Sequence, residues 1–205
     1  MVTSTSELCS YAETKGGLRI ILEIFDYDVD KKSLIGPAPL AARFAEEIRR
    51  EHENFGLMVD LSHLPLLRES SAEAVIPVKD YLVHAHMGNA VVKDPGFDAY
   101  GDNHPRFGFP GGANDVDEVV EYLKVLLSIG FLNTDDPPVL SFEVKPWGEV
   151  GHTAPGWEHS AFQLDAGLWE GGALLFLGPF SGGRPFRTNP IGPGDRHPLQ
   201  QGDHR

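Results

Sequence analysis

The stretch Phe55-Gly-Leu-Met-Val-Asp-Leu-Ser-His63 is the best guide to the fold of the chain. It is an apolar run that ends in a carboxylate, followed three residues later by an imidazole. Apolar runs of this length are typical of strands buried in a parallel sheet. Asp60 stands at the carboxyl end of the run, and His63 follows three residues later. Side chains at such positions point toward a shared edge when several parallel strands lie side by side.

Three further apolar runs carry a similar residue near their ends. The first, Leu18 to Ile24, reads as a buried parallel strand and contains Glu23. Tyr81 to His86 ends in an imidazole, and Val139 to Val144 carries Glu143. Four strands that each finish in a metal-ligand type of side chain predict a barrel of parallel strands with its chemical centre at their carboxyl ends.

Helices are predicted between these strands, so the fold class is α/β with about four βα units. The spacing of apolar residues and the Gly or Pro residues at the boundaries predict four helices. They are Ser4 to Lys15, Leu40 to Glu53, a helix that starts at Ser71 and breaks at Pro77, and a helix from Asn114 or Asp115 to Ile129. The long connection Met87 to Ala113 shows neither the apolar period of a helix nor that of a strand, and it resembles a substrate lid.

Composition divides the chain near residue 150. Residues 1–150 carry the strand and helix patterns, whereas residues 151–205 hold eleven of the 23 glycines and six of the 16 prolines. Apolar residues in this last part are scattered rather than periodic. We therefore expect one barrel-type domain over 1–150 and an irregular, poorly ordered tail over 151–205.

The charge of the chain excludes several classes of partner. A formal net charge of -13 argues against nucleic acid, which is bound through lysine and arginine. No apolar segment is long enough to cross a membrane, and none resembles a signal peptide. A single cysteine, Cys9, fits a small buried side chain in a helix and a reducing compartment. The cytoplasm is the expected location.

The candidate metal ligands are Glu23, Asp60, His86 and Glu143. Three carboxylates and one imidazole suit Mn²⁺, Mg²⁺ or Co²⁺ better than a structural zinc ion. One acidic residue at a strand end is most often a helix cap or a surface charge, so the prediction depends on their recurrence at successive strands. His84 is open to two interpretations, a second site residue or a hydrogen-bonded core histidine.

Three segments together resemble a known family. Asp60-Leu-Ser-His63, His84-Ala-His86-Met-Gly-Asn and Ser141-Phe-Glu143-Val-Lys-Pro are similar to metal-binding strands of the xylose isomerase-like TIM-barrel superfamily. This superfamily includes tagatose and psicose 3-epimerases and hydroxypyruvate isomerase. Glu23 matches its first metal-binding glutamate. The resemblance covers about Ser4 to Glu149.

The resemblance implies a divalent-metal-dependent sugar or sugar-phosphate isomerase or epimerase that moves a proton through an enediolate. Glu23 and Glu143 would be both metal ligands and the catalytic acid and base, and His63 would bind a substrate hydroxyl. The family's epimerases carry an arginine six residues beyond the metal-binding histidine, where this chain has Val92 followed by Lys93. Lys93, His104 and Arg106 are therefore candidates for binding the substrate.

A full barrel of this family has eight strands, and this chain supplies only the second half. Two alternatives to an active epimerase or isomerase stay open. The chain could be a non-catalytic half-barrel that pairs with a complementary half or with copies of itself. An apurinic-site endonuclease shares the fold, but it needs a basic surface, and residues 1–150 contain 25 acidic against 13 basic side chains.

Overall fold

The computed structural model describes residues 1–133 and 138–145. The predicted tail, 151–205, lies outside the described residues, so the division near residue 150 stays a prediction. The described elements run in the order α1 (Val2–Thr14), β1 (Ile20–Glu23), α2 (Ala38–Arg49), β2 (Phe55–Asp60), α3 (His63–Leu67), α4 (Ser71–Val75), the 3-10 helix η1 (Ile76–Val78), β3 (Leu82–Met87), α5 (Val116–Ser128) and β4 (Val139–Phe142).

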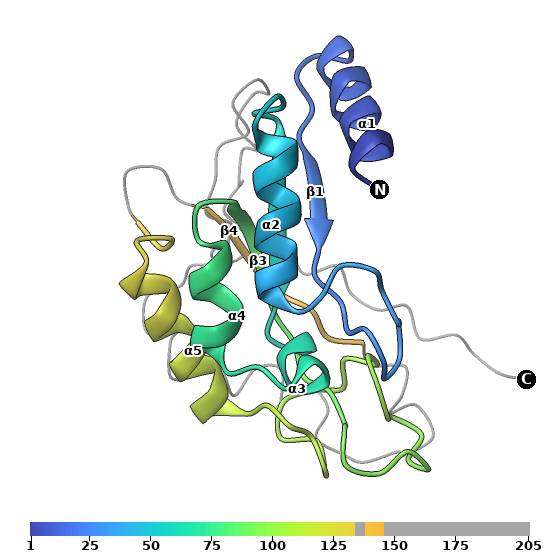
Figure 1. The fold of residues 1–205 in the computed structure, drawn as a ribbon. Helices are drawn as coiled ribbons and strands as arrows, with labels where there is room; N and C mark the ends of the chain where they lie inside the picture. The colour runs from blue at the N-terminus through green and yellow to red at the C-terminus, as the bar shows by residue number, and fades with distance from the viewer. Residues whose placement is uncertain (134–137, 146–205) are drawn as a thin grey trace, which may run out of the picture.

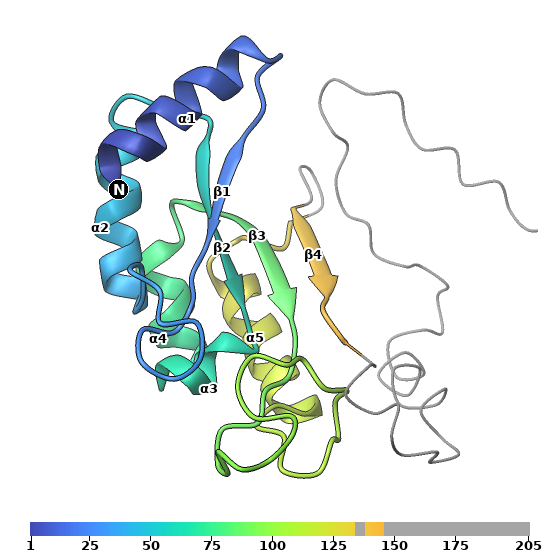
Figure 2. The same ribbon diagram turned by 90° about the vertical axis from the view of Figure 1, so that its right-hand side faces the viewer.

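The strands form one parallel sheet in the order β1-β2-β3-β4. Their carboxyl ends therefore lie at one end of the sheet, where α3 and the connection between β3 and α5 are found (Figure 1, Figure 2). Strand order follows chain order, as expected when each strand is linked to the next by a crossover over one face. The predicted succession of βα units is confirmed for the described residues.

Local sequence signals account for where the helices begin. Ser70 and Glu73 form a capping box at α4, and Asp115 and Glu118 form another at α5. Pro37 occupies the position before α2, where a proline costs no helical hydrogen bond. The predicted break at Pro77 is the point where α4 gives way to η1.

The hydrophobic core lies between the sheet and the helices α2, α4 and α5, which cover one face of it (Figure 2). Leu57 and Val59 of β2 point into this core. Because side chains alternate along a strand, Met58 and Asp60 point to the opposite face. Cys9 is fully buried in α1, as predicted.

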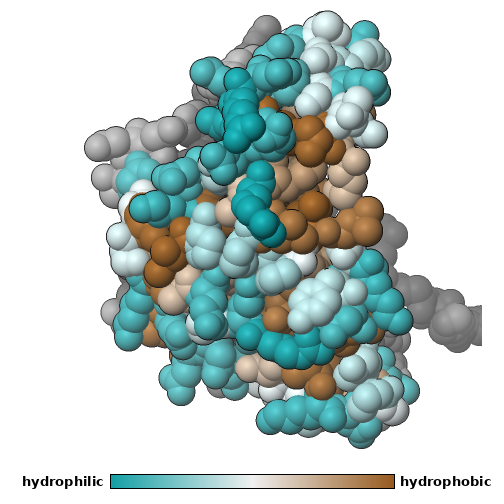
Figure 3. Space-filling view, viewed as in Figure 1, coloured by the Kyte–Doolittle hydropathy of each residue, from teal (hydrophilic) through white to brown (hydrophobic). Residues whose placement is uncertain are grey.

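The face of the sheet that carries Asp60 is more open than the core face. Ile21 of β1 and Val139 of β4 are each 41% exposed. The prediction of a buried parallel strand from Leu18 to Ile24 is therefore wrong in its extent, because β1 begins at Ile20, Ile21 is exposed and its other three residues are half-buried. Apolar surface is also visible beside α1 and β1 (Figure 3), where Leu8 and Leu18 are exposed.

The long connection between β3 and α5 folds back on itself across the carboxyl end of the sheet (Figure 2). Val91 forms isolated bridges with Tyr100 and Gly112. Asn89 Oδ1 accepts hydrogen bonds from the backbone of Ala90 and Asn114, and its Nδ2 donates to the Arg106 carbonyl. These bonds give the connection a defined shape, which a flexible linker would lack.

The sequence did not indicate α3, a single short turn that begins at His63 and contains Pro65. Leu64, Leu66 and Leu67 are buried, so tertiary packing rather than helix propensity stabilises this turn. The fourth strand ends at Phe142, so Glu143 lies one residue beyond it. Among the described residues, no helix is long and apolar enough to cross a membrane.

Asp26 organises the loop between β1 and α2. Its buried carboxylate accepts backbone hydrogen bonds at 2.8 Å from Val29, 2.8 Å from Asp30 and 3.0 Å from Lys31. Burial by itself would raise the pKa of this carboxyl, but these three donors and the Lys32 N–H together outweigh it, and the pKa is lowered. The loop conformation thus depends on an ionised carboxylate.

We predict that Asp26→Asn lowers the free energy of unfolding by about 1–3 kcal/mol at pH 7, measured by urea denaturation. Because the folded pKa is lowered, the stabilisation is complete above the ordinary pKa of an aspartate and is lost as the pH falls through the folded value. Asp28→Asn is the control, since Asp28 pairs with the exposed Arg68 and with no other side chain among the described residues. Equal losses in the two variants would contradict the role given to Asp26.

Candidate functional site

The structure brings together the four predicted metal ligands. One ligand atom each from Glu23, Asp60, His86 and Glu143 lies within 4.8 Å of the others. The four side chains come from the carboxyl ends of four adjacent strands or from the residue just beyond. Such a convergence from four separate segments is the geometry of a candidate divalent metal site.

The register of the sheet explains this convergence. Asp60 of β2 pairs with His86 of β3, and His86 pairs with Ser141 of β4. Residues paired across parallel strands project from the same face, so Asp60 and His86 are neighbours there. Glu143 is two residues beyond Ser141, and its backbone N–H donates to the Met87 carbonyl at 3.0 Å, which continues the ladder. Glu23 reaches the group from β1.

Asp60 is the most deeply buried of the four, with no exposed surface. Its Oδ1 accepts a 2.7 Å hydrogen bond from the Ser62 N–H. Its Oδ2 has no hydrogen-bond partner among the described residues and faces His86 Nδ1 at 3.6 Å. Burial raises the pKa of this carboxyl, but the imidazoles of His86 and His63 outweigh it, and the pKa lies below the ordinary value.

His86 and Glu143 contact each other directly, with 2.9 Å between Nδ1 and Oε2. Burial lowers the pKa of His86, but Asp60 and Glu143 together raise it above the ordinary value. Lys145 adds a cation beside this pair, with its Nζ 3.5 Å from Glu143 Oε1. The carboxylates are therefore balanced in part by cations of the chain itself.

Glu23 titrates in the opposite sense from Asp60. Burial is the largest cause and raises its pKa, only partly offset by the imidazole of His63. Because its pKa is raised, the Glu23 carboxyl holds its proton up to a higher pH than an ordinary glutamate does. This difference separates Glu23 from Asp60 within one small site.

The donor set fits a divalent cation. Three carboxylates and one imidazole are hard ligands of the kind that Mn²⁺, Mg²⁺ and Co²⁺ accept. The buried Asp60 Oδ2 without a hydrogen-bond partner is the observation that favours a cation most directly, because an unpaired buried carboxylate oxygen is costly. Glu23, Asp60, His86 and Glu143 would hold the ion.

Asp60 also belongs to a second, fully buried group with His63 and His104. His63 Nδ1 donates to the Ile24 carbonyl at 2.9 Å, and Nε2 contacts Asp102 Oδ1 at 3.1 Å. Both ring nitrogens of His63 are thus engaged by acceptors, and neither offers a lone pair to a metal. This second group is better described as a hydrogen-bonded network than as a metal site.

The predicted substrate-binding residues occupy different places. His63 is buried, with both nitrogens bonded within the protein, so binding a substrate would require it to exchange one of these bonds. His104 is also buried, with Nε2 3.5 Å from Glu143 Oε1. The Arg106 guanidinium donates to the Phe107 carbonyl, and Lys93 is exposed on the loop. Substrate binding by these four residues stays a prediction.

Sequence reasoning missed Asp102 and Lys145. Asp102 lies two residues before His104 in the loop and contacts both buried imidazoles. An acidic residue close to a histidine in a Gly-rich loop is only weak evidence for a functional residue. The role of Asp102 becomes visible only when the folded loop brings it to both imidazoles. His84 is neutral beside His86, since burial and the His86 charge lower its pKa to about 4.

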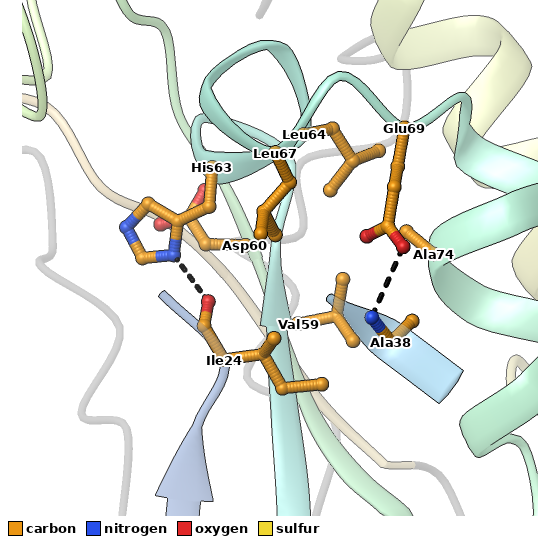
Figure 4. A pocket seen from close by; sticks show the side chains of 9 residues that line it. All are labelled: Ile24, Ala38, Val59, Asp60, His63, Leu64, Leu67, Glu69 and Ala74. Atoms are coloured by element: carbon orange, nitrogen blue, oxygen red, sulfur yellow. Dashed lines mark hydrogen bonds between the residues drawn. The ribbon is translucent and has the colours of Figure 1, made fainter. Parts of the chain in front are cut away.

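A narrow cavity lies behind Asp60, on the side of α3 and α4. Its lining is mostly aliphatic, and the His63 ring and the Glu69 carboxylate border it (Figure 4). Glu69 Oε1 accepts a hydrogen bond from the Ala38 N–H. The cavity has room for about one water molecule at most, so it is not a sugar site.

Comparison with known proteins bears on this arrangement. No protein-family model matches the sequence, and neither does any curated protein. Among solved structures, an L-ribulose 3-epimerase matches with a TM-score of 0.53 and 17% identity, over 82% of this chain and 52% of that one. A D-allulose 3-epimerase from Methylomonas sp. matches with a TM-score of 0.50 and 19% identity, over 70% of this chain and 41% of that one.

These matches show that the chain shares its fold with part of the sugar 3-epimerase structures. Its described part is a partial (βα)8 barrel, which confirms the fold class predicted from the sequence. A D-psicose 3-epimerase structure gives the same picture, with a TM-score of 0.50 and 15% identity over 70% of this chain and 40% of that one. The chain spans about half the length of the solved structures that it matches, or less.

We predict that Mn²⁺ or Co²⁺ raises the melting temperature, since an ion that binds only the folded protein stabilises it by about 2.7 kcal/mol at a hundredfold excess over Kd. Asp60→Asn should abolish the shift, because it removes the negative charge of the most buried ligand. Asp80→Asn, an exposed aspartate that precedes β3 and so lies at the opposite end of this strand from His86, should retain it. A shift that survives Asp60→Asn unchanged would refute the ligand assignment.

Proposed function

We propose that the chain forms the catalytic half of a divalent-metal-dependent sugar or sugar-phosphate epimerase or isomerase. One observation supports this most strongly. Four potential ligands converge within 4.8 Å at the carboxyl ends of four successive parallel strands, where barrel enzymes carry their active sites. The small-molecule partner would be an open-chain ketose or hydroxyaldehyde, with or without a phosphate.

The two glutamates are the proposed acid and base. Glu23 and Glu143 come from the first and last strands of the sheet, so they approach the centre of the site from opposite sides. A bound divalent cation would polarise the sugar carbonyl and so acidify the neighbouring C–H group. One glutamate would remove that proton, and return of a proton to the other face or to the adjacent carbon would give the epimer or the isomer.

The electrostatics of the site are compatible with these roles. Burial raises the pKa of Glu23, which makes its carboxylate a stronger base than that of an ordinary glutamate. The Lys145 ammonium, 3.5 Å from Glu143 Oε1, is placed to stabilise negative charge that develops beside it. The solved structures of similar fold include an L-ribulose 3-epimerase and a D-allulose 3-epimerase, which supports sugars as the substrate class.

A second candidate is a half-barrel that acts only when paired. It is favoured by the open inner face of the sheet, where Ile21 and Val139 are each 41% exposed. In a closed barrel these positions are filled by side chains from the other strands. A DNA-cleaving relative is disfavoured by the net charge of -13, which opposes binding of a polyanion.

The proposal predicts exchange of solvent deuterium into the carbon next to the sugar carbonyl. Glu23→Gln and Glu143→Gln each keep an oxygen ligand but lose the base, so each should lower the exchange rate by about 100-fold or more. Exchange is followed by NMR in D₂O with Mn²⁺, over a panel of ketoses, hydroxypyruvate and their phosphates. Glu121→Gln, an exposed change on α5, serves as the control.

The same assay separates the two candidates. Exchange by the chain alone supports an enzyme that needs no further half. Exchange that requires an added chain carrying the first four strands of a related barrel supports the paired half-barrel. Wild-type rates in either glutamine variant would refute the assigned acid and base.

A further inference from the structure

Asp102 is the point where two loops and two imidazoles meet. Its Oδ1 lies 2.7 Å from His104 Nε2 and 3.1 Å from His63 Nε2, and its Oδ2 lies 3.1 Å from Lys31 Nζ. Its backbone N–H donates to Asp30 Oδ2 at 2.9 Å. The residue is 4% exposed. A buried carboxylate with this many charged partners is rigidly held.

The two imidazoles that Asp102 contacts each face one of the proposed catalytic glutamates. His63 Nδ1 lies 3.7 Å from Glu23 Oε1. His104 Nε2 lies 3.5 Å from Glu143 Oε1. Asp102 therefore touches neither glutamate but is linked to both, through one histidine on each side. Glu23 and Glu143 come from opposite edges of the sheet.

The surrounding backbone is built for this contact. Gly101 has a φ of +88°, and a Cβ there would lie 2.9 Å from Asp30 Oδ2. A side chain at that position would displace the Asp30 carboxylate, which accepts the hydrogen bond from the Asp102 N–H. His104 has a φ of +46°, unusual for a residue with a side chain, and its carbonyl accepts a 2.8 Å hydrogen bond from the Lys145 N–H. The loop is thus fastened on both sides of Asp102.

We propose that Asp102 is a positioning residue for the metal and proton-transfer site. It holds His63 against Glu23 and His104 against Glu143, and so fixes the two carboxylates in the orientation that ligation and proton transfer require. Partners that orient ligands in this way commonly change metal affinity or activity 10–100-fold when removed. The effect on catalysis rests on the proposed function, whereas the effect on metal affinity depends only on the cluster.

A purely structural role would have a different signature. If Asp102 only fastened the loop, its loss would lower stability and leave metal affinity and turnover in the folded protein unchanged. If it positions the glutamates, the change appears in the folded variant, in metal binding and in turnover rather than in sugar binding. Metal affinity should fall, and kcat should fall while KM changes little, because the reacting groups rather than the sugar contacts are displaced.

The test compares Asp102→Asn with Asp98→Asn, an exposed aspartate of the same loop. Calorimetric titration with Co²⁺ is expected to show binding about 10–100-fold weaker for Asp102→Asn and unchanged for Asp98→Asn. In the deuterium-exchange assay, kcat should fall by a similar factor with KM within about threefold. Wild-type Co²⁺ affinity in folded Asp102→Asn would overturn the proposal.

Two further measurements keep the outcome decisive. Imidazole ¹⁵N NMR of the metal-free protein should show altered His63 and His104 signals in Asp102→Asn, and unaltered signals would contradict the positioning role. If Asp102→Asn does not fold, Lys31→Met removes the ammonium that contacts Asp102, from a side chain that is 43% exposed. This variant should bind Co²⁺ more weakly than the wild type, by a factor of up to about ten. Unchanged Co²⁺ affinity would overturn the proposal. Altered metal binding without exchange on any sugar, with or without the added complementary half, would refute the proposed function and leave the role of Asp102 standing.

Discussion

The parallel pairing of Asp60 with His86 is the constraint on which the rest of the site depends. A shift of one residue between β2 and β3 would turn one of the two side chains into the helix-covered core, where Leu57 and Val59 pack. The apolar alternation of β2 thus fixes the register and the site together. Glu23 and Glu143 are then brought in by the neighbouring strands, with no further element required.

Placing three carboxylates within a few ångströms carries an electrostatic cost, and the fold offsets it in several ways. Burial raises the pKa of Glu23, while the imidazoles of His86 and His63 lower that of Asp60. Burial opposes protonation of His63, but Asp102 and Asp60 raise its pKa to about 9. A divalent cation would complete this balance, because it supplies two positive charges at the point where the carboxylates converge.

Much of this arrangement was predictable from sequence, because it depends on local periodicity. Apolar runs ending in Glu23, Asp60, His86 and Glu143 implied parallel strands whose ends meet, and the structure brings all four together. The turn α3 was not predictable from the sequence, because a five-residue segment that contains Pro65 has no helical pattern. Burial of its leucines in the folded protein is what stabilises it. The contacts of Asp102 were also out of reach, because they join residues up to 72 positions apart through an aperiodic loop.

The most direct test of the central claim is a crystal structure of the protein grown with Mn²⁺ and measured at a wavelength where manganese scatters anomalously. The account predicts one strong anomalous peak, with Glu23, Asp60, His86 and Glu143 as its protein ligands at about 2.0–2.3 Å. It also predicts that His63 and His104 remain on Asp102, outside the coordination sphere. A peak held by His63 and His104, or no peak between the four strand ends at saturating Mn²⁺, would contradict it.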